Sequence, residues 1–209
     1  MNTNKQLATS ATRIASSNHQ IDESKICPRA RAIVEKLTAA NYQAYLVGGC
    51  VRDLMLNITP KDFDVVTDAR PEQICKLFSN SRMIGRRFRL VHVYSNRNFI
   101  EVSTFRAVAD ASKQRHTEEA NNGRILRDNT YGNIEQDAIR RDFTINALYY
   151  DLASSEVLDF CNGIDDLRNG QIRIIGDAYT RYKEDPVRML RALRFKAKLG
   201  LQIEPETAQ

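Results

Sequence analysis

Apolar and polar residues follow two different spacings along this chain, and the spacing predicts which segments are helices and which are strands. Beginning at Pro28, apolar residues recur every three or four positions, which predicts a helix with one buried face. Around Asp64, acidic and apolar residues alternate, which predicts a strand over 61–67. Further helices are predicted at 49–56, from 71, at 134–141 and from 177, and further strands at 45–47, 90–94, 98–105, 156–160 and 172–175.

Two segments lack such spacing. Residues 1–24 are rich in Ser, Thr, Asn and Gln, so a disordered N-terminal tail is expected. Residues 107–129 are polar and charged, and a loop of this length is usually functional or disordered. Residues 205–209 resemble the start of another helix, so the chain is expected to be a fragment. In the last helical region, apolar contacts are expected from Val187, Leu190, Leu193 and Leu199.

Composition narrows the class of protein. The 209 residues are 42% apolar and 27% charged, which is ordinary for a chain that buries a core. The net charge of +5 favours an anionic partner such as RNA or a nucleotide. The four cysteines form no C-x-x-C pair, so no zinc site is expected. A reducing compartment is expected for this chain. The sequence shows neither a secretory signal nor a long apolar run, so a cytoplasmic location is expected.

The acidic residues of the 61–67 strand are the first candidates for chemistry. Asp62 and Asp64 would project from one face of the strand, roughly 7 Å apart, with Phe63 facing the core. Carboxylates on one face suit hard divalent cations such as Mg²⁺. Glu101 lies in an otherwise apolar strand and is the candidate third carboxylate. Alternatively, the two aspartates cap a turn, and Glu101 is an ordinary surface charge.

A glycine turn precedes these acids. Gly48 and Gly49 end an apolar strand and open a helix, where backbone N–H groups can face a phosphate chain. Arg52 would add a mobile pair of donors for phosphate oxygens, and Asp53 would orient Arg52 or cap the helix. A generic strand-to-helix turn is the alternative. No dinucleotide-binding fingerprint or P-loop is present in the sequence.

Two later segments carry paired charges. Arg141 and Asp142 follow a helical stretch and suit contacts with a triphosphate or a ribose, or they form a solvated helix end. Asp185 and Arg188 are three residues apart on a predicted helix, where they could imitate a base edge or form a surface ion pair. His92 lies in an apolar strand, where a structural role is expected.

Taken together, four segments in this order resemble the bacterial class II nucleotidyltransferases: LVGGCVRD at 46–53, DFD at 62–64, RRDFTIN at 140–146 and EDPVRMLRA at 184–192. This superfamily contains poly(A) polymerases and CCA-adding tRNA nucleotidyltransferases. The resemblance covers about residues 25–205, and segments 85–93 and 126–138 look like the poly(A) polymerase branch. It implies an α+β fold, with a palm-like head whose mixed β-sheet is flanked by helices. The head is expected at 25–175 and the start of an α-helical neck at 176–209, with body and tail domains absent here.

The resemblance also implies an activity, which is the addition of AMP from ATP to RNA 3′ ends with release of pyrophosphate. It implies two Mg²⁺ ions as cofactors and leaves the oligomeric state unknown. The residues that it implicates are Asp62, Asp64 and Glu101 for metal and catalysis, Gly48, Gly49 and Arg52 for triphosphate, Arg141 and Asp142 for the nucleotide, and Asp185 and Arg188 for the base. Cys50 stands where the family often has a third glycine.

Three other functions stay open from sequence alone. A CCA-adding enzyme would use the same chemistry. A phosphatase of the haloacid-dehalogenase type would use Asp62 as a nucleophile, because Asp62–Thr67 superficially resembles its D-x-D-x-[TV] motif. A nucleotide- or RNA-binding module without activity is the non-enzymatic alternative.

Overall fold

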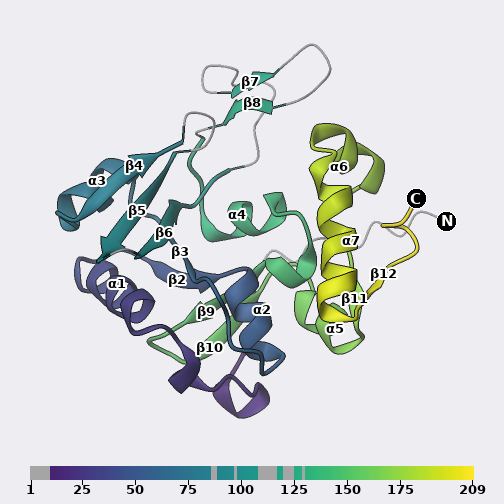
Figure 1. Cartoon of the computed structure of the whole chain (residues 1–209), viewed down its shortest axis with the longest axis horizontal. Coiled ribbons are helices and arrows are strands. Elements are labelled where there is room, and N and C mark those ends of the chain that lie inside the picture. Colours follow the sequence, from purple (N-terminus) through teal and green to yellow (C-terminus); the bar gives the residue numbers. More distant parts are fainter. Residues whose placement is uncertain (1–9, 86–88, 97, 108–116, 120–124, 129) are drawn as a thin grey trace.

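A computed structural model describes residues 10–85, 89–96, 98–107, 117–119, 125–128 and 130–209. An eight-stranded mixed sheet forms its centre (Figure 1). All neighbouring strands pair antiparallel except β3 and β6, which are parallel. In spatial order the strands are β1 (Thr12–Ile14), β10 (Glu156–Asp159), β9 (Leu148–Asp151), β2 (Ala44–Val47), β3 (Asp64–Thr67), β6 (Asn98–Thr104), β5 (Leu90–Ser95) and β4 (Ser81–Ile84).

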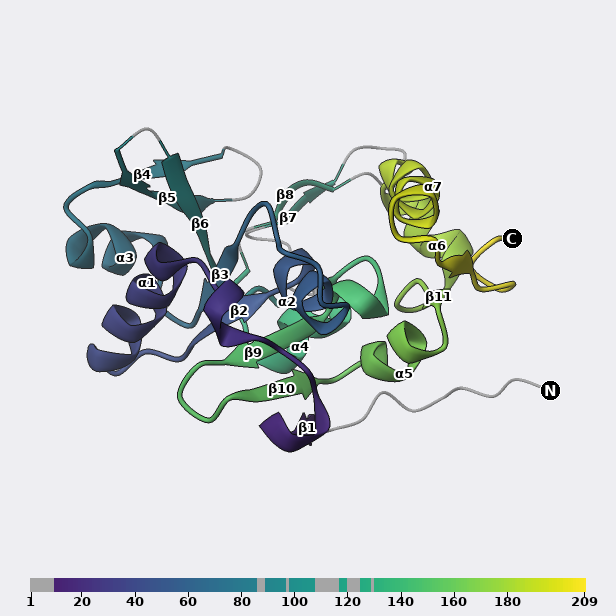
Figure 2. The ribbon, with the colours of Figure 1, turned by 60° about the horizontal axis from the view of Figure 1, so that its bottom comes forward.

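Helices cover both faces of this sheet. On one face α1 (Pro28–Ala39) packs against β2 and β3, and α3 (Pro71–Leu77) packs against β4 and β5 (Figure 2). On the other face Ala138 of α4 (Ile134–Arg140) packs with Val47, Val66 and Tyr149. The remaining helices are α2 (Gly49–Met55), α5 (Gly163–Arg168), α6 (Ala178–Glu184), α7 (Val187–Leu199) and the 3₁₀ helices η1 (Ser16–Asn18), η2 (Glu23–Lys25) and η3 (Thr144–Asn146).

Local sequence explains where these elements begin. Proline occupies the first turn of α1 and of α3, where its missing N–H costs no hydrogen bond. Asn133 caps α4, because its side chain accepts from the Gln136 N–H while the Gln136 side chain accepts from the Asn133 N–H. The predicted apolar face of α1, made by Ile33, Val34 and Leu37, is buried. The predicted α+β architecture, with a mixed sheet between helices, is confirmed.

The predicted disordered tail is wrong for residues 10–24. β1 pairs with β10 at the edge of the sheet, and Glu23 accepts hydrogen bonds from the hydroxyls of Tyr150 and Ser155 at 2.7 Å each. Hydrogen bonds of polar side chains therefore hold this segment in place, and no apolar stripe is needed. A prediction from amino-acid composition could not detect this order. Residues 1–9 lie outside the described residues.

Several element boundaries differ from the expectation. The strand predicted at 61–67 begins only at Asp64. Within 107–129, β7 (Thr117–Glu119) pairs with β8 (Ile125–Asp128), so the segment is not entirely irregular, and its other residues beyond 107 lie outside the described part of the chain. The 172–175 strand is reduced to β11 (Gln171–Ile172), which pairs in parallel with β12 (Gln202–Ile203). Residues 205–208 form turns, not a helix.

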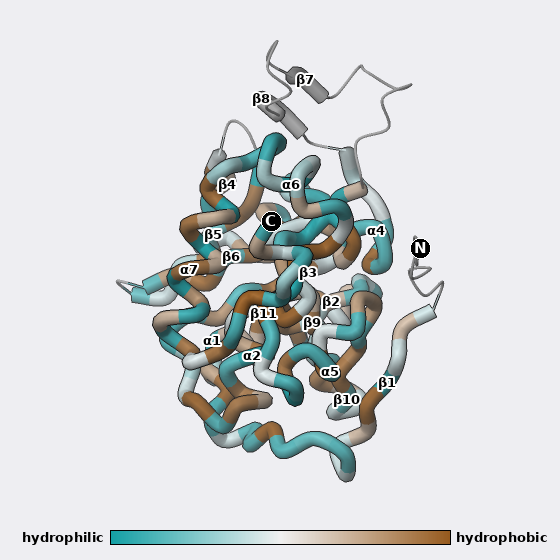
Figure 3. Tube along the Cα trace, turned by 90° about the vertical axis from the view of Figure 1, so that its right-hand side faces the viewer, coloured by the Kyte–Doolittle hydropathy of each residue, from teal (hydrophilic) through white to brown (hydrophobic). Residues whose placement is uncertain are grey.

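The C-terminal helices dock on the sheet domain through few side chains. Ala192 and Phe195 are the buried residues of α7. Leu199 packs against the core as expected, whereas Val187, Leu190 and Leu193 are 52%, 67% and 58% exposed and do not lie in the core. Figure 3 shows the chain from the side of α7, with apolar positions along that helix. None of the helices in the described ranges combines the length and apolar composition that a bilayer crossing needs.

Candidate active site

The acidic centre of the site lies where β3 and β6 run side by side. Asp64 and Glu101 are register partners on these parallel strands, so their side chains project from the same face of the sheet. Val47 is the register partner of Asp64 on β2, and His92 is that of Glu101 on β5. One row across four strands therefore contains Val47, Asp64, Glu101 and His92. The two carboxylates lie between His92 and Val47, which precedes the glycine turn.

The electrostatics of the pair reflect this crowding. Desolvation, followed by the charges of Glu101 and Asp62, raises the pKa of Asp64 to about 6 against the opposing effect of Arg141. Desolvation also raises the pKa of Glu101, which the charge of Arg106 partly offsets. Desolvation disfavours the ionised form of both acids, and the charge of Glu101 adds to this effect at Asp64, so a cation would be stabilised beside them.

Asp62 stands apart from this pair. Like Asp64 it is exposed, but it precedes β3, and its charge contributes to the raised pKa of Asp64. Within the described ranges, no group of three or more His, Cys, Asp and Glu side chains is close enough together to hold a metal ion. The structure thus brings Asp64 and Glu101 together and does not place Asp62 with them in such a group.

The glycine turn requires glycine at Gly48. Its φ of +79° and ψ of −130° lie in a region that residues with a Cβ rarely adopt. A Cβ at this position would lie 3.5 Å from Nη1 of Arg141, so the guanidinium packs directly over the turn. At the next position but one, the buried Cys50 thiol donates to the carbonyl of Val47 at 3.3 Å, and burial raises its pKa to about 12. Cysteine in place of a third glycine is accommodated.

Arg141 is held by a buried acid and a phenol. Its Nη2 and Nε donate to Oδ2 of Asp137 at 2.9 and 3.1 Å, and Nε also donates to the Tyr149 hydroxyl at 3.1 Å. Tyr149 in turn donates to Asp137 at 2.9 Å. Burial would raise the pKa of Asp137, but Arg141 and Tyr149 lower it below its ordinary value. This support fixes the guanidinium beside Gly48, where its charge opposes the rise in the pKa of Asp64.

Arg52 is not the mobile donor that was predicted. It is 3% exposed, and its guanidinium donates to Oδ1 of Asp53 at 2.6 and 2.9 Å and to Oδ1 of Asn146 at 2.6 Å. It also stacks over the ring of Phe195, 5.0 Å from the centroid. The sequence suggested that Asp53 could orient Arg52, and this alternative is confirmed. A contact of Arg52 with phosphate stays a prediction.

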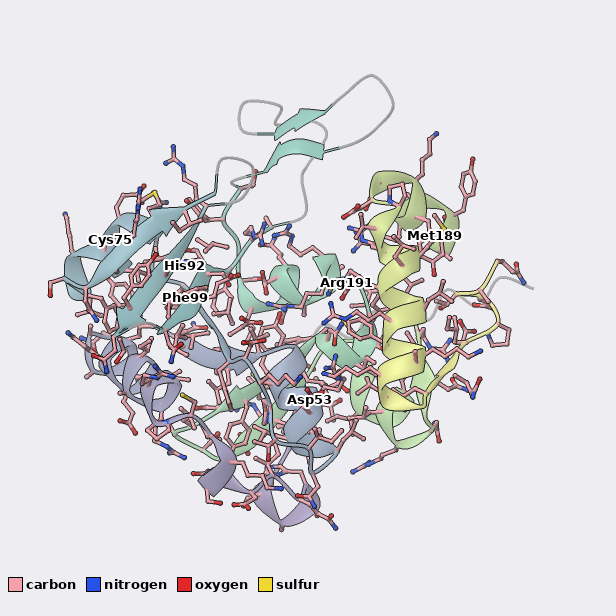
Figure 4. The ribbon with its side chains drawn as sticks, viewed as in Figure 1. Asp53, Cys75, His92, Phe99, Met189 and Arg191 are labelled. Atoms are coloured by element: carbon pink, nitrogen blue, oxygen red, sulfur yellow. The ribbon has the colours of Figure 1, made fainter. Side chains whose placement is uncertain are left out.

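Asp142 faces the C-terminal helices. Its Oδ2 accepts from Nε of Arg191 at 2.6 Å, and its Oδ1 accepts from Nδ2 of Asn146 at 3.2 Å. Arg191 also lies 5.5 Å from the centroid of the Phe195 ring. Figure 4 shows Arg191 on α7 on the right-hand side of the molecule and Asp53 between it and the α1 side.

Asp185 and Arg188 do not form the surface ion pair considered from sequence. Asp185 ends α6 in an extended backbone conformation, and its carboxylate accepts from the N–H of Val187 at 3.3 Å. Arg188 donates instead to Glu184 at 2.9 Å and to the carbonyl of Arg181 at 2.5 Å. Arg181 donates to the carbonyls of Arg140 and Arg141 at 2.7 and 2.6 Å, which ties α6 to the end of α4.

Sequence reasoning missed the supporting residues Asp137, Asn146, Tyr149 and Phe195. Asp137 and Arg141 are four residues apart near one helix, a spacing that brings side chains together and could have signalled the pair. Asn146 was part of a recognised segment but received no role. Tyr149 and Phe195 carried no signal, because an aromatic residue in an apolar stretch predicts only a core position.

Comparison with known proteins identifies the family of this chain. The family model of the poly A polymerase head domain matches residues 44–173. The chain belongs to this family. Poly(A) polymerase I of Escherichia coli O6:H1 is 52% identical over 200 residues, which are 95% of this chain and 43% of that protein. The CCA-adding enzyme of Leuconostoc mesenteroides is 41% identical over 178 residues, 85% of this chain and 42% of that enzyme.

A solved structure agrees with the family assignment. The Bacillus stearothermophilus CCA-adding enzyme in complex with CTP matches with a TM-score of 0.72 at 33% identity, over 87% of this chain and 42% of that chain. This member of the poly A polymerase head family therefore spans less than half the length of these relatives. The matched range 44–173 lies within the head predicted at 25–175, and the boundary with a neck at 176 stays a prediction.

Proposed function

We propose that this chain carries the nucleotide-transfer site of a poly(A) polymerase, which adds AMP from ATP to RNA 3′ ends. The observation that carries the proposal is the register pairing of Asp64 with Glu101 beside Gly48 and Arg141. In the reaction, the primer 3′-hydroxyl oxygen bonds to the α-phosphorus of ATP. The bond from that phosphorus to the β-phosphate bridging oxygen breaks, pyrophosphate leaves with the electron pair, and the hydroxyl proton passes to solvent.

We propose that Asp62, Asp64 and Glu101 hold Mg²⁺, two ions in all. Carboxylate oxygens are the ligands that Mg²⁺ prefers, and the raised pKa values of Asp64 and Glu101 fit a site that favours a cation. Bound Mg²⁺ would promote deprotonation of the attacking hydroxyl and offset the charge of the leaving pyrophosphate. Asp62, which is exposed next to β3, would complete the ligand set.

The protein's own groups would position the nucleotide. The glycine turn allows the triphosphate to approach the backbone, and Arg141 above it donates to phosphate oxygens. Asp142 would hold the ribose side. Asp185 would accept from the adenine amine and Arg188 would donate to a ring nitrogen, with Arg188 oriented by Glu184.

The choice of poly(A) over CCA addition rests on similarity. The poly(A) polymerase relative is 52% identical, against 41% for the CCA-adding relative. Membership of this family leaves no place for the phosphatase alternative. The expected cytoplasmic location stays a prediction.

Incorporation assays with the full-length protein test the proposal. Each NTP is supplied separately with an RNA primer, and products are sequenced. We expect long A tails from ATP, at least a thousandfold less product from Asp64→Asn and Glu101→Gln, and unchanged far-ultraviolet circular dichroism for both. Short C-C-A additions from mixed CTP and ATP would favour the CCA-adding alternative. RNA or ATP binding without any transfer would favour the non-enzymatic one.

A further inference from the structure

An aromatic cluster on β5 and β6 has no role in the site described above. The rings of His92 and Phe99 stack with centroids 3.8 Å apart and planes 12° apart. The Tyr94 ring lies 5.9 Å from that of Phe99 and 6.1 Å from that of His92. Phe99 is 49% exposed, so much of this ring reaches solvent. A stacked, solvent-facing aromatic pair can accept another flat ring.

Strand register places the cluster beside the carboxylates. His92 pairs with Glu101, and its Nε2 lies 3.8 Å from Oε2 of that acid. Phe99 precedes Glu101 by two residues and therefore lies on the same face of β6. Figure 4 shows His92 and Phe99 together on β5 and β6, across from Arg191 on α7. The cluster thus flanks the acids on the β5 side, whereas Gly48 and Arg141 flank them on the β2 side.

This order matches the direction of an in-line displacement. The attacking hydroxyl must approach the α-phosphate opposite the leaving pyrophosphate. With the pyrophosphate at Gly48 and Arg141, the hydroxyl arrives from the side of β5. The nucleotide that carries this hydroxyl then lies over His92 and Phe99. Arg82, the exposed register partner of His92 on β4, adds a cation on the same face for the RNA backbone.

We propose that Phe99 and His92, with Tyr94 beside them, form the stacking platform for the 3′-terminal base of the RNA primer. The inference rests on the proposed function, because it assigns the primer side of the same site. Every base has a face that can stack on an aromatic ring, so this contact tolerates any terminal base. An enzyme that extends its own product and unrelated 3′ ends requires such tolerance.

The test is a double-mutant cycle between Phe99 and the primer base in the full-length protein. One primer ends in adenosine, and the other ends in an abasic ribose that keeps its 3′-hydroxyl. Wild type is compared with Phe99→Leu, which keeps apolar bulk without the ring, and with Phe99→Tyr, which keeps the ring. Tyr179→Leu is the matched control, since it removes a 76% exposed ring from α6. Primer affinity is measured by fluorescence anisotropy, and KM for RNA and for ATP by incorporation.

For Phe99→Leu we expect primer affinity to fall roughly tenfold, the size of one base–aromatic stack, and KM for ATP to stay unchanged. Wild type should bind the abasic primer roughly tenfold more weakly than the primer that ends in adenosine. Phe99→Leu should bind the two primers equally. Phe99→Tyr and Tyr179→Leu should behave as wild type. Additive losses, or equal affinity of wild type for both primers, would overturn the platform. If the affinities show coupling between Phe99 and the primer base but no AMP is transferred, the platform is retained and the proposed function is rejected. If AMP is transferred without such coupling, the proposed function is retained and the platform is rejected.

Discussion

The carboxylate of Asp142 accepts a hydrogen bond from Nε of Arg191 at 2.6 Å, and this ion pair joins the segment after α4 to helix α7. Asn146 extends the link, because it donates to Asp142 and accepts from Arg52 on α2. Phe195 closes the ring of contacts between the guanidinium groups of Arg52 and Arg191. The glycine turn, the Arg141–Asp142 segment and α7 therefore form one connected unit.

This connection predicts that Arg191→Gln destabilises the protein although Arg191 is 46% exposed. Loss of the ion pair and of the stacking on Phe195 should lower the free energy of unfolding by about 1 kcal/mol, as for other partly exposed pairs. Urea unfolding measures this value. Arg194→Gln, at an exposed position of the same helix, is the control and should change stability by much less. Equal effects of the two substitutions would show that Arg191 is an ordinary surface residue.

Gly48→Ala tests the glycine turn. The positive φ should cost roughly 1–3 kcal/mol of stability, and the added methyl group would lie in van der Waals contact with Nη1 of Arg141, 3.5 Å away, and fill the space above the turn. We expect KM for ATP to rise at least tenfold. Gly200→Ala is a matched control, because Gly200 also has a positive φ of +71° but nothing lies within 4 Å of its Cβ position. A comparable rise in KM for Gly200→Ala would mean that backbone strain alone explains the defect.

Gly163→Ala isolates a steric effect. A Cβ there would lie 2.2 Å from the carbonyl oxygen of Thr144 and 2.7 Å from its carbonyl carbon, so the backbone must shift. We expect a loss of about 1–3 kcal/mol in the free energy of unfolding, typical of an overpacked core. The loss should exceed that of Gly200→Ala in the same urea titration. Wild-type stability would show that α5 and η3 separate without cost.

Glu23 predicts a dependence of stability on pH. Hydrogen bonds from Tyr150 and Ser155, with a further one from Arg31, lower the pKa of Glu23 from 4.5 to about 2. The folded state thus favours the ionised acid. Its stabilisation is complete above the unfolded-state pKa of 4.5 and is lost as pH falls toward about 2.

Thermal unfolding across this pH interval provides the measurement. The melting temperature of wild type should exceed that of Glu23→Gln above pH 4.5, and the difference should shrink as the pH falls toward 2. Glu35→Gln, at an exposed position of α1, should follow wild type throughout. A difference for Glu23→Gln that stays constant over the interval would contradict the linkage.

The sequence by itself determined the kinds of element and the order of the candidate residues. Helical spacing after Pro28 and the glycines after Val47 are local signals, because propensity, capping and turn geometry depend on neighbours along the chain. The recognised segments therefore identified Gly48 and Asp64 as candidates without any coordinates, and Glu101 stood out as an acid in an otherwise apolar strand. Polar residues 10–24 misled the same reasoning, since their order depends on partners more than a hundred residues away.

Tertiary structure alone decided which of these residues meet. The parallel pairing of β3 with β6 sets Asp64 beside Glu101, and such a pairing between distant segments has no signature in local spacing. Burial turned Arg52 from an expected mobile donor into a fixed link, because a guanidinium withdrawn from water must find acceptors within the protein. The sequence thus specifies the residue types and the local structure, whereas the partners of each side chain depend on how the strands pair and on which groups are withdrawn from water.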